Sequence, residues 1–438
     1  MSEIHTTNGA NNDERAIVVG ATVRGSDPLF ELDDSLSELS LLADTAGLTV
    51  VSQFHQTLNR IDPATFIGSG KVDEVKAAAE QIGAQVIVFD DELSPRHQRE
   101  LEKRFGEDVK VLDRSALILD IFAQHAQTRE GALQVELAQY EYRLPRLTRQ
   151  WTHLARQAGG SGSSGGVGLR GPGETQLEVD RREIGRKIAK LKRDIEQVRQ
   201  HRGRHRLQRH RAGIPVIALV GYTNAGKSTL LRSLTNSNVY VADQLFATLD
   251  PTTRRVSLPS NRETLFTDTV GFIQKLPTTL VAAFRATLEE IAHANVLIHV
   301  VDVSHPNVVE QIEAVEDTLA EIDVPGIPRI LVWNKIDRWP SDQFPEFATD
   351  ESYNAQVGIS AQKQINIDKL MKVIEDIISL PLTSMKLLIP YKRGELVSML
   401  YEIATIEERN DTAEGAEITA QLPRFLVERF QEFQIKEE

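Results

Sequence analysis

The chain has 438 residues, no cysteine and a formal net charge of −13, with 63 acidic residues against 50 Lys or Arg. The missing cysteine excludes disulfides, thiolate metal sites and a cysteine nucleophile, and it suits a reducing cytoplasm. Residues 1–15 lack the apolar core of a signal peptide, and apolar runs such as 296–303 are far shorter than the ~20 residues that span a bilayer, so we expect a soluble cytoplasmic protein without a membrane span.

After a polar tail at 1–14 that we expect to be disordered, residues 15–130 alternate short apolar runs with helix-like segments. The expected strands are Ala16–Val23, Leu48–Phe54, Val86–Phe89 and Val109–Leu112, and the expected helices are Leu32–Ala46, Val72–Ile82 and Pro95–Phe105. This alternation predicts a small parallel α/β domain. A dinucleotide-binding fold is the alternative, but Gly20–Gly25 does not spell G-x-G-x-x-G, and Gly68–Lys71 is better interpreted as a helix start than as a phosphate loop.

Residues 131–212 predict an antiparallel helical hairpin, whose first helix covers Gly131–Leu154. The second helix, Arg181–Arg211, contains 13 Lys or Arg and three acidic residues, so its net charge is +10. The remaining chain therefore carries about −23. Its apolar residues recur at helical spacing and form one packing stripe: Ile184, Ile188, Leu191, Ile195 and Val198. The cationic remainder suits either a solvated coiled coil or contact with RNA phosphates. The Gly- and Ser-rich tip at 159–173 is either a flexible linker or a contact loop.

A phosphate-binding loop follows the apolar run 216–220, where Gly221–Thr229 reads G-Y-T-N-A-G-K-S-T and opens a helix. Glycines let the backbone curl so that its N–H groups and the helix N-terminus point at phosphates. Lys227 is expected to reach the β- and γ-phosphates, and the Ser228 hydroxyl to bind the Mg²⁺ that bridges them. The expected nucleotide-contacting residues of this loop are Gly221, Tyr222, Thr223, Asn224, Ala225, Gly226, Lys227 and Ser228.

Two further segments complete the phosphate side. Asp268-Thr269-Val270-Gly271 spells D-x-x-G after a strand, so Asp268 is expected to hold Mg²⁺ through water and the Gly271 amide to sense the γ-phosphate. Upstream, Phe246-Ala247-Thr248-Leu249-Asp250 supplies Thr248 as the switch threonine that completes the Mg²⁺ shell, with Thr252 and Thr253 as rivals. Ser228 and Thr248 are thus the expected protein ligands of the metal.

A guanine-reading motif, N-K-x-D, lies at Asn334-Lys335-Ile336-Asp337 after the apolar run 330–333. The Asp337 carboxylate can accept two hydrogen bonds from the guanine edge, while Asn334 supports the loop and Lys335 covers the ring face. Ser360-Ala361-Gln362 is the expected last guanine-contacting turn. The motif order predicts a GTPase domain at 213–381, followed by a small α/β module at 382–438 with a helix at Glu395–Ala404.

The residues after D-x-x-G indicate slow unaided hydrolysis. Gly271 is followed by Phe272 and Ile273, where many GTPases carry a water-orienting Gln, and an apolar side chain cannot polarise the attacking water. The missing factor of about 10³–10⁵ in rate would come from a partner or another group. The expected catalytic residues are Lys227, Thr248 and Gly271, and Asn224 either holds a catalytic K⁺ or only caps the loop.

Beyond these generic motifs, the chain resembles the HflX family of translation-factor-class GTPases over most of its length. The resemblance rests on F-A-T-L-D-P-T-T-R-R from Phe246, D-T-V-G-F from Asp268, G-L-R-G-P-G-E-T-Q-L-E from Gly168, D-R-S-A-L-I-L-D-I-F-A-Q from Asp113, F-I-G-S-G-K-V-D-E-V from Phe66 and W-T-H-L from Trp151. The chain departs from the family's commoner pattern by extra Ser and Gly at Ser161–Gly165, within the tip loop.

The resemblance implies a GTPase that binds the large (50S) ribosomal subunit and the 70S ribosome and is stimulated by them, and we expect it to be a monomer. It implies splitting or rescue of stalled ribosomes, often under stress, with 181–211 and 159–173 contacting ribosomal RNA. It also links the N-terminal region to ATP. The alternative from another class is a GTP-dependent regulatory switch that acts on a non-ribosomal protein partner, with the basic helix serving only as coiled coil.

Overall fold

The computed structural model describes residues 14–147, 176–211, 214–235, 245–246, 249, 251–276, 291–321, 326–341, 343–346, 352–378, 383–422, 427 and 429–435. The chain divides into two compact units, one built mainly from residues before 194 and one mainly from residues after it. None of the described helices is both long enough and apolar enough to cross a membrane. The expected tip loop, 159–173, lies outside the described residues.

The N-terminal unit contains a four-stranded parallel sheet in the order β2-β1-β3-β4. Its strands are β1 (Glu14–Val23), β2 (Leu48–Leu58), β3 (Val86–Phe89) and β4 (Lys110–Asp113). Its helices are α1 (Leu32–Thr45), α2 (Ser69–Ile82), α3 (Pro95–Phe105) and α4 (Arg114–His125). The predicted parallel α/β domain is confirmed, and Gly68 is the N-cap of α2, as expected of a helix start.

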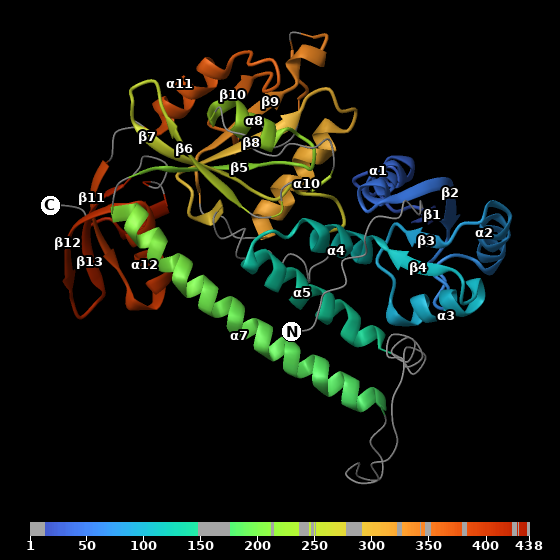
Figure 1. Cartoon of the computed structure of the whole chain (residues 1–438). Coiled ribbons are helices and arrows are strands. Elements are labelled where there is room, and N and C mark those ends of the chain that lie inside the picture. The colour runs from blue at the N-terminus through green and yellow to red at the C-terminus, as the bar shows by residue number, and fades with distance from the viewer. Residues whose placement is uncertain are drawn as a thin grey trace. The chain divides into compact units, whose positions relative to one another are not determined.

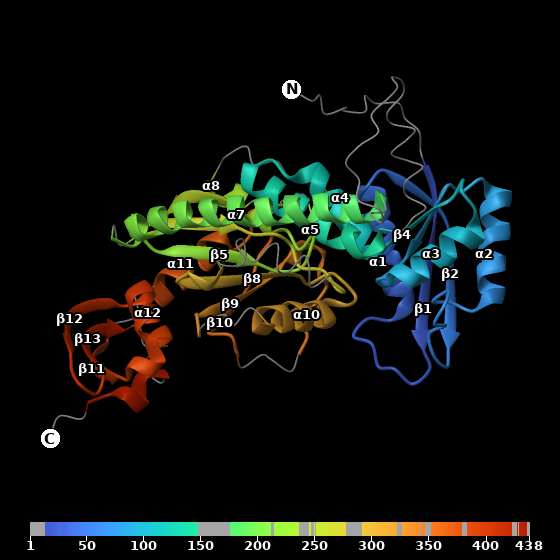
Figure 2. The same ribbon diagram turned by 90° about the horizontal axis from the view of Figure 1, so that it is seen from below.

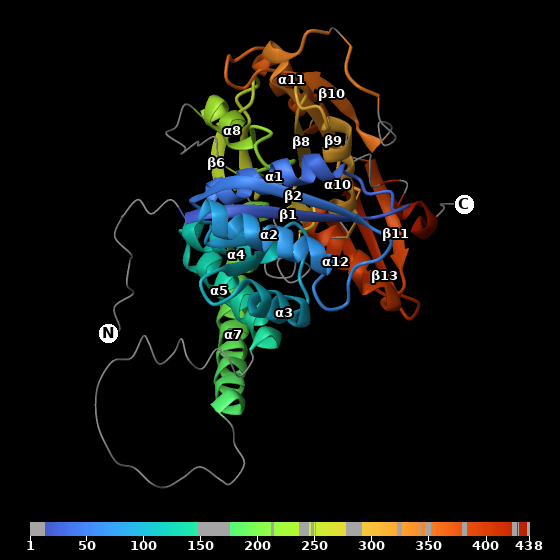
Figure 3. The same ribbon diagram turned by 90° about the vertical axis from the view of Figure 1, so that its right-hand side faces the viewer.

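Alternation along the strands decides which helices cover each face of this sheet (Figure 3). Ile17 and Val19 of β1 share one apolar core with α2 and α3. Gly20 points to the opposite face, where an added Cβ would lie 2.8 Å from Leu32 of α1. Helix α4 contacts α1 and was not foreseen, because apolar residues surround it on most sides and leave no one-sided stripe.

Two helices follow the N-terminal sheet, namely α5 (Arg129–Arg143) and the 36-residue α7 (Gln176–Arg211), which Figures 1 and 2 show running side by side. Lys187 of α7 donates to the Tyr140 hydroxyl at 3.2 Å, and Lys192 pairs with Glu141 at 2.8 Å. The expectation of one unbroken helix from Gly131 to Leu154 is wrong, since α5 ends at Arg143 and a 3₁₀ turn (η1, Leu144–Arg146) comes next, while residues 148–154 lie outside the described part of the chain. Pro145 explains this, because it has no backbone N–H to bond to the carbonyl four residues earlier and its ring clashes with that carbonyl.

The second unit contains a six-stranded sheet in the order β10-β9-β8-β5-β7-β6, in which only β6 is antiparallel to its neighbour. The strands are β5 (Val216–Val220), β6 (Thr252–Ser257), β7 (Glu263–Asp268), β8 (Val296–Asp302), β9 (Arg329–Asn334) and β10 (Ala355–Gly358). Helices α8 (Lys227–Thr235) and α11 (Ile367–Ile378) pack on one face, and α10 (Val308–Glu321) packs on the other (Figure 2). The predicted GTPase-type α/β fold is confirmed.

A smaller antiparallel sheet in the order β11-β13-β12 forms the C-terminal module. Its elements are β11 (Thr383–Ile389), η5 (Tyr391–Arg393), α12 (Gly394–Ile403), β12 (Thr405–Asp411), β13 (Ala416–Leu422) and η6 (Gln431–Phe433). Leu396 and Leu400 of α12 pack with Leu387 and Ile418 of the sheet in one apolar core. The small C-terminal α/β module expected from the sequence is therefore present.

Candidate guanine-nucleotide site

The phosphate loop joins the end of β5 to the start of α8, and its glycines are required by space as well as by backbone angle. Gly221 has φ +146°, and an added Cβ would lie 2.2 Å from the carbonyl oxygen of Val300. Gly226 has φ +98°, and its Cβ would lie 2.3 Å from Nδ2 of Asn334. Side chains rarely adopt these angles, so both positions select glycine. The two glycines thereby let the loop pack directly against Val300 and Asn334.

Lys227 stands at the start of α8 with only 6% of its surface exposed. Its ammonium donates to the carbonyl oxygens of Gly221 at 3.0 Å and Tyr222 at 2.8 Å. Burial lowers the pKa of Lys227 to about 8, and the nearby charge of Asp268 opposes that shift. The loop's own carbonyls thus hold this cation at the place where phosphate oxygens are expected.

We expect nucleotide affinity to depend on the protonation of Lys227. The bound phosphates favour the charged form and raise its pKa, so GTP affinity should be highest below pH of about 8 and fall by up to about tenfold per pH unit above it. Isothermal titration between about pH 6.5 and about pH 9, in two buffers with different ionisation enthalpies, should also show proton uptake on binding near the upper end. A flat affinity profile without proton uptake would contradict this role.

The D-x-x-G segment runs against the phosphate loop. Asp268 ends β7 fully buried and accepts a hydrogen bond of 2.6 Å from the Ser228 hydroxyl. The Phe272 amide donates to Gly221, and the Thr223 amide donates to Phe272, so the two segments pair like strands. An added Cβ on Gly271 would lie 3.1 Å from Nζ of Lys227. The backbone of Gly271 therefore lies next to the Lys227 ammonium.

The oxygen atoms of Ser228 and Asp268 fit a hard cation. Among the described residues, no cluster of three or more His, Cys, Asp or Glu could hold a metal alone. Mg²⁺ suits such a site, because it keeps several waters and binds through one or two protein oxygens together with substrate phosphates. The donor chemistry therefore agrees with Mg²⁺ bound together with a nucleotide.

The N-K-x-D segment joins the phosphate side to the base side. The Asn334 amide donates from Nδ2 to the Ala225 carbonyl at 2.9 Å and accepts at Oδ1 from the Ala361 amide at 3.0 Å. Lys335 has the left-handed φ of 64°, and its ammonium donates to Asn224 O at 3.0 Å and to Asp302 at 2.7 Å. The Asn334 side chain thus holds the phosphate loop and the S-A-Q turn at a fixed separation.

Asp337 is prepared to stay ionised. A hydrogen bond from Ser360, assisted by Lys363 at 3.2 Å, holds the pKa of the Asp337 carboxyl below its usual range. An ionised carboxylate is acceptor-only, which suits two neighbouring donors on a base edge. Guanine presents such a pair in its N1–H and exocyclic amine.

The structure gathers most of the predicted residues at the carboxyl ends of the parallel strands. The described members near the loop and β7 are Gly221, Tyr222, Thr223, Asn224, Ala225, Gly226, Lys227, Ser228, Asp268, Thr269, Val270 and Gly271. Those on the base side are Asn334, Lys335, Ile336, Asp337, Ser360, Ala361 and Gln362. Phe246 and Leu249 are described and buried, whereas Ala247, Thr248 and Asp250 lie outside the described residues. The rivals Thr252 and Thr253 belong to β6, where the Thr253 hydroxyl is bonded to that of Thr267.

Sequence reasoning missed three supporting contacts. Asp302 holds Lys335, Lys363 pairs with Asp337, and the Tyr222 hydroxyl accepts a hydrogen bond from the backbone N–H of Gln274. Asp302 carried a signal, because it ends an apolar strand at the same sheet edge as Asp268 and Asn334. No local pattern marked the other two contacts.

Comparison with known families matches four consecutive segments of the chain. Residues 33–123 match "GTP-binding GTPase N-terminal", 125–209 match "GTP-binding GTPase Middle Region", 216–335 match "50S ribosome-binding GTPase" and 348–425 match "HflX C-terminal domain". Together these matches cover most of the chain.

Curated relatives extend over nearly the whole length. A "GTPase HflX" of Caldanaerobacter subterraneus subsp. tengcongensis is 42% identical over 97% of this chain and 94% of its own. The GTPase HflX of Escherichia coli K12 is 44% identical over 86% of each chain. Among solved structures, a GTP-binding protein of Sulfolobus solfataricus in complex with GDP is 24% identical, covers 82% of this chain and 97% of its own, and has a TM-score of 0.42. By its relatives and its four matched segments, the chain belongs to the HflX family, binds guanine nucleotides and is a GTP-hydrolysing enzyme.

Proposed function

We propose that this GTPase is Mg²⁺-dependent, binds the large ribosomal subunit and the 70S ribosome, and is stimulated by them to hydrolyse GTP while it splits or rescues stalled ribosomes. Its nucleotide chemistry rests on one observation above all, the Asn334 side chain that holds the phosphate loop and the base-side turn together. We assign the chemistry to 213–381 and the ribosomal contact to 131–212, in a cytoplasmic monomer.

In this proposal Lys227 and the loop amides bind the phosphates, and Ser228 and Thr248 hold Mg²⁺, with Asp268 acting through water. Mg²⁺ would neutralise charge on the phosphates during transfer. The Gly271 amide would sense the γ-phosphate. Phe272 and Ile273 are both 4% exposed and carry no group that could orient water, which supports a need for external stimulation. Asn224 would hold K⁺ in the same site.

The ribosomal partner is supported by two observations. The segment 216–335 matches a family described as "50S ribosome-binding GTPase". In addition, α7 exposes cations on an otherwise acidic protein, and of these Arg186 and Lys190 lie on its open surface. Such a cationic helix suits the phosphates of ribosomal RNA, a polyanion.

The test is GTP turnover by the protein alone, with 50S subunits and with 70S ribosomes, while light scattering follows dissociation of 70S particles. We expect stimulation by about 10² or more, and dissociation with a non-hydrolysable GTP analogue, because binding rather than hydrolysis would drive splitting. Stimulation without dissociation would retain ribosome dependence but refute splitting. If the ribosomal particles neither bind the protein nor stimulate hydrolysis, the result would favour a switch that acts on a non-ribosomal protein.

Charge variants sharpen this test. Lys187 and Lys192 contact α5, so their removal would also disturb the hairpin. The double variant Arg186→Gln/Lys190→Gln should instead weaken 50S binding and reduce the slope of log affinity against log salt by about one unit per lost phosphate contact. The matched control is Lys369→Gln/Lys372→Gln, which removes two exposed charges from α11. Equal salt slopes in both double variants would exclude α7 as the RNA contact.

A further inference from the structure

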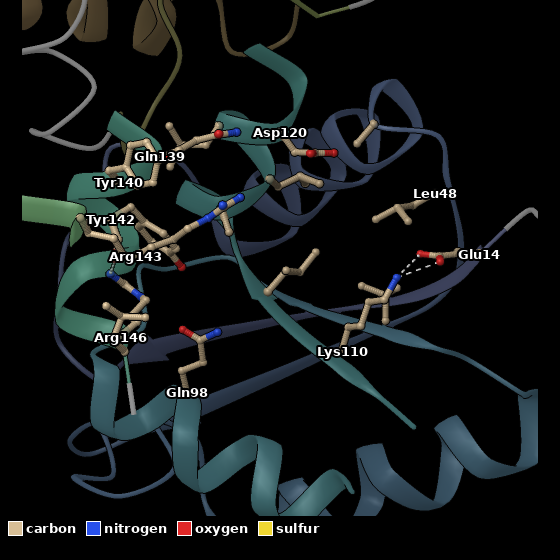
Figure 4. A pocket seen from close by; sticks show the side chains of 18 residues that line it. Glu14, Leu48, Gln98, Lys110, Asp120, Gln139, Tyr140, Tyr142, Arg143 and Arg146 are labelled. Atoms are coloured by element: carbon tan, nitrogen blue, oxygen red, sulfur yellow. Dashed lines mark hydrogen bonds and ion pairs between the residues drawn. The ribbon is translucent and has the colours of Figure 1, made fainter. Parts of the chain in front are cut away.

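A cavity of about 550 Å³ lies inside the N-terminal unit, and none of the residues that line it belongs to the guanine-nucleotide site (Figure 4). Its walls come from the sheet, from α3, α4 and α5, and from Ile184 of α7. Part of the lining is apolar, with Leu48, Leu112 and Leu117 among its residues. A mainly apolar cavity with a few polar groups is the usual form of a small-molecule site.

Two buried polar atoms in the lining have no hydrogen-bond partner. The Arg146 side chain is only 9% exposed, and its two terminal nitrogens donate to Tyr142 O at 3.0 Å and Leu93 O at 2.7 Å. Its Nε is buried and unpartnered, and so is Oε1 of Gln98. Buried donors and acceptors are nearly always satisfied, because an unmade hydrogen bond costs about 1–3 kcal/mol. Both atoms lie beneath the cavity lining, where solvent does not reach them.

The cavity is electrostatically asymmetric. Lys110 is neutralised by Glu14 at 2.9 Å, and Figure 4 shows this pair on the side opposite the arginines. Arg143 and Arg146 lie together at the other side, and the Arg146 guanidinium stacks over the Tyr142 ring at 3.6 Å from its centroid. Arg146 is paired with two carboxylates, Glu92 at 3.3 Å and Asp113 at 3.5 Å, whereas Arg143 is exposed. An anionic group would therefore settle at the arginine end.

We propose that this cavity binds a small aromatic anion, with its flat apolar body against the leucines and its carboxylate or sulfonate group at Arg143. A polyphosphate suits the cavity poorly, because the carboxylates of Glu14 and Asp120 also line it. Since α5, α7 and the sheet share these walls, the occupant would tie the C-terminal end of α5 and the N-terminal part of α7 to the sheet.

The test uses 1-anilinonaphthalene-8-sulfonate, which has an aromatic body, an N–H and a sulfonate, with the full-length protein in saturating GDP so that the guanine site is filled. We expect a single saturable fluorescence increase. Ala116→Phe, which fills the cavity from α4, should weaken the affinity by about tenfold or more, and Arg143→Gln by about three- to tenfold. Arg99→Gln, the same charge change at an exposed position of α3 outside the lining, should leave the affinity unchanged.

Unchanged GDP affinity and circular dichroism will show that each variant folds. Equal probe binding by the wild type, Ala116→Phe and Arg143→Gln would mean adventitious adsorption and would overturn the site. Non-saturable binding would do the same. If Arg99→Gln lost as much probe affinity as Arg143→Gln, the loss would be an effect of surface charge, and the proposal would be rejected.

Discussion

Asp337→Asn should weaken GTP binding by about 10²–10⁴ and make the protein prefer xanthosine triphosphate. The ionised carboxylate of Asp337 accepts from both guanine donors, and each hydrogen bond to a charged group contributes about 1.5–3 kcal/mol. An Asn amide offers one acceptor and turns an N–H against the exocyclic amine of guanine. Xanthine carries an oxygen in place of that amine, so it can accept from the same N–H. Competition of GTP and xanthosine triphosphate against labelled GDP measures the change.

A matched control is Asp302→Asn on the neighbouring strand. Asp302 binds the Lys335 ammonium at 2.7 Å and has no place at the guanine edge in this assignment. Its variant should therefore weaken both triphosphates alike and keep the wild-type preference for GTP. If Asp337→Asn retained that preference as well, the assignment of Asp337 as the guanine reader would be refuted.

The sequence predicts the phosphate loop well because its requirements are local. An apolar strand, two glycines with positive φ and a helix start lie within consecutive residues, and each leaves its own mark on the residue types. The parallel N-terminal sheet was predictable for a similar reason. Its buried strands read as continuous apolar runs such as Val86–Phe89, separated by helix-length segments.

The contacts that complete the site were less predictable, because they join segments far apart in the chain. Asn334 bonds to Ala225 and Ala361, and Tyr222 bonds to Gln274, yet no periodicity relates these positions. Helix α4 was missed for a different reason, since its buried residues surround the axis and hide the helical period. Its start was marked all the same, because Asp113 caps the Ala116 amide at 2.8 Å.

Gly226→Ala should abolish most nucleotide binding, by about 100-fold or more, and lower the thermal midpoint. The left-handed φ of +98° costs a side chain about 1–2 kcal/mol, and the new Cβ would lie 2.3 Å from Asn334 Nδ2. Asn334 would have to move, and its bonds to Ala225 and Ala361 would break together. The phosphate loop would then lose its link to the base side. GDP titration and thermal unfolding measure the two effects.

Gly185→Ala in α7 is the control that separates site geometry from the general effect of replacing glycine. Nothing lies within 4 Å of a Cβ added there, and the residue is inside a helix. Alanine is favoured over glycine in helices by about 0.5–1 kcal/mol, so this variant should unfold at a higher temperature and bind GDP normally. If the two glycine-to-alanine variants shift the thermal midpoint in opposite directions, the lost GDP binding of Gly226→Ala is due to its backbone φ and to the contact with Asn334. Normal GDP binding by Gly226→Ala would instead show that the loop tolerates a side chain and that the Asn334 link does not control affinity.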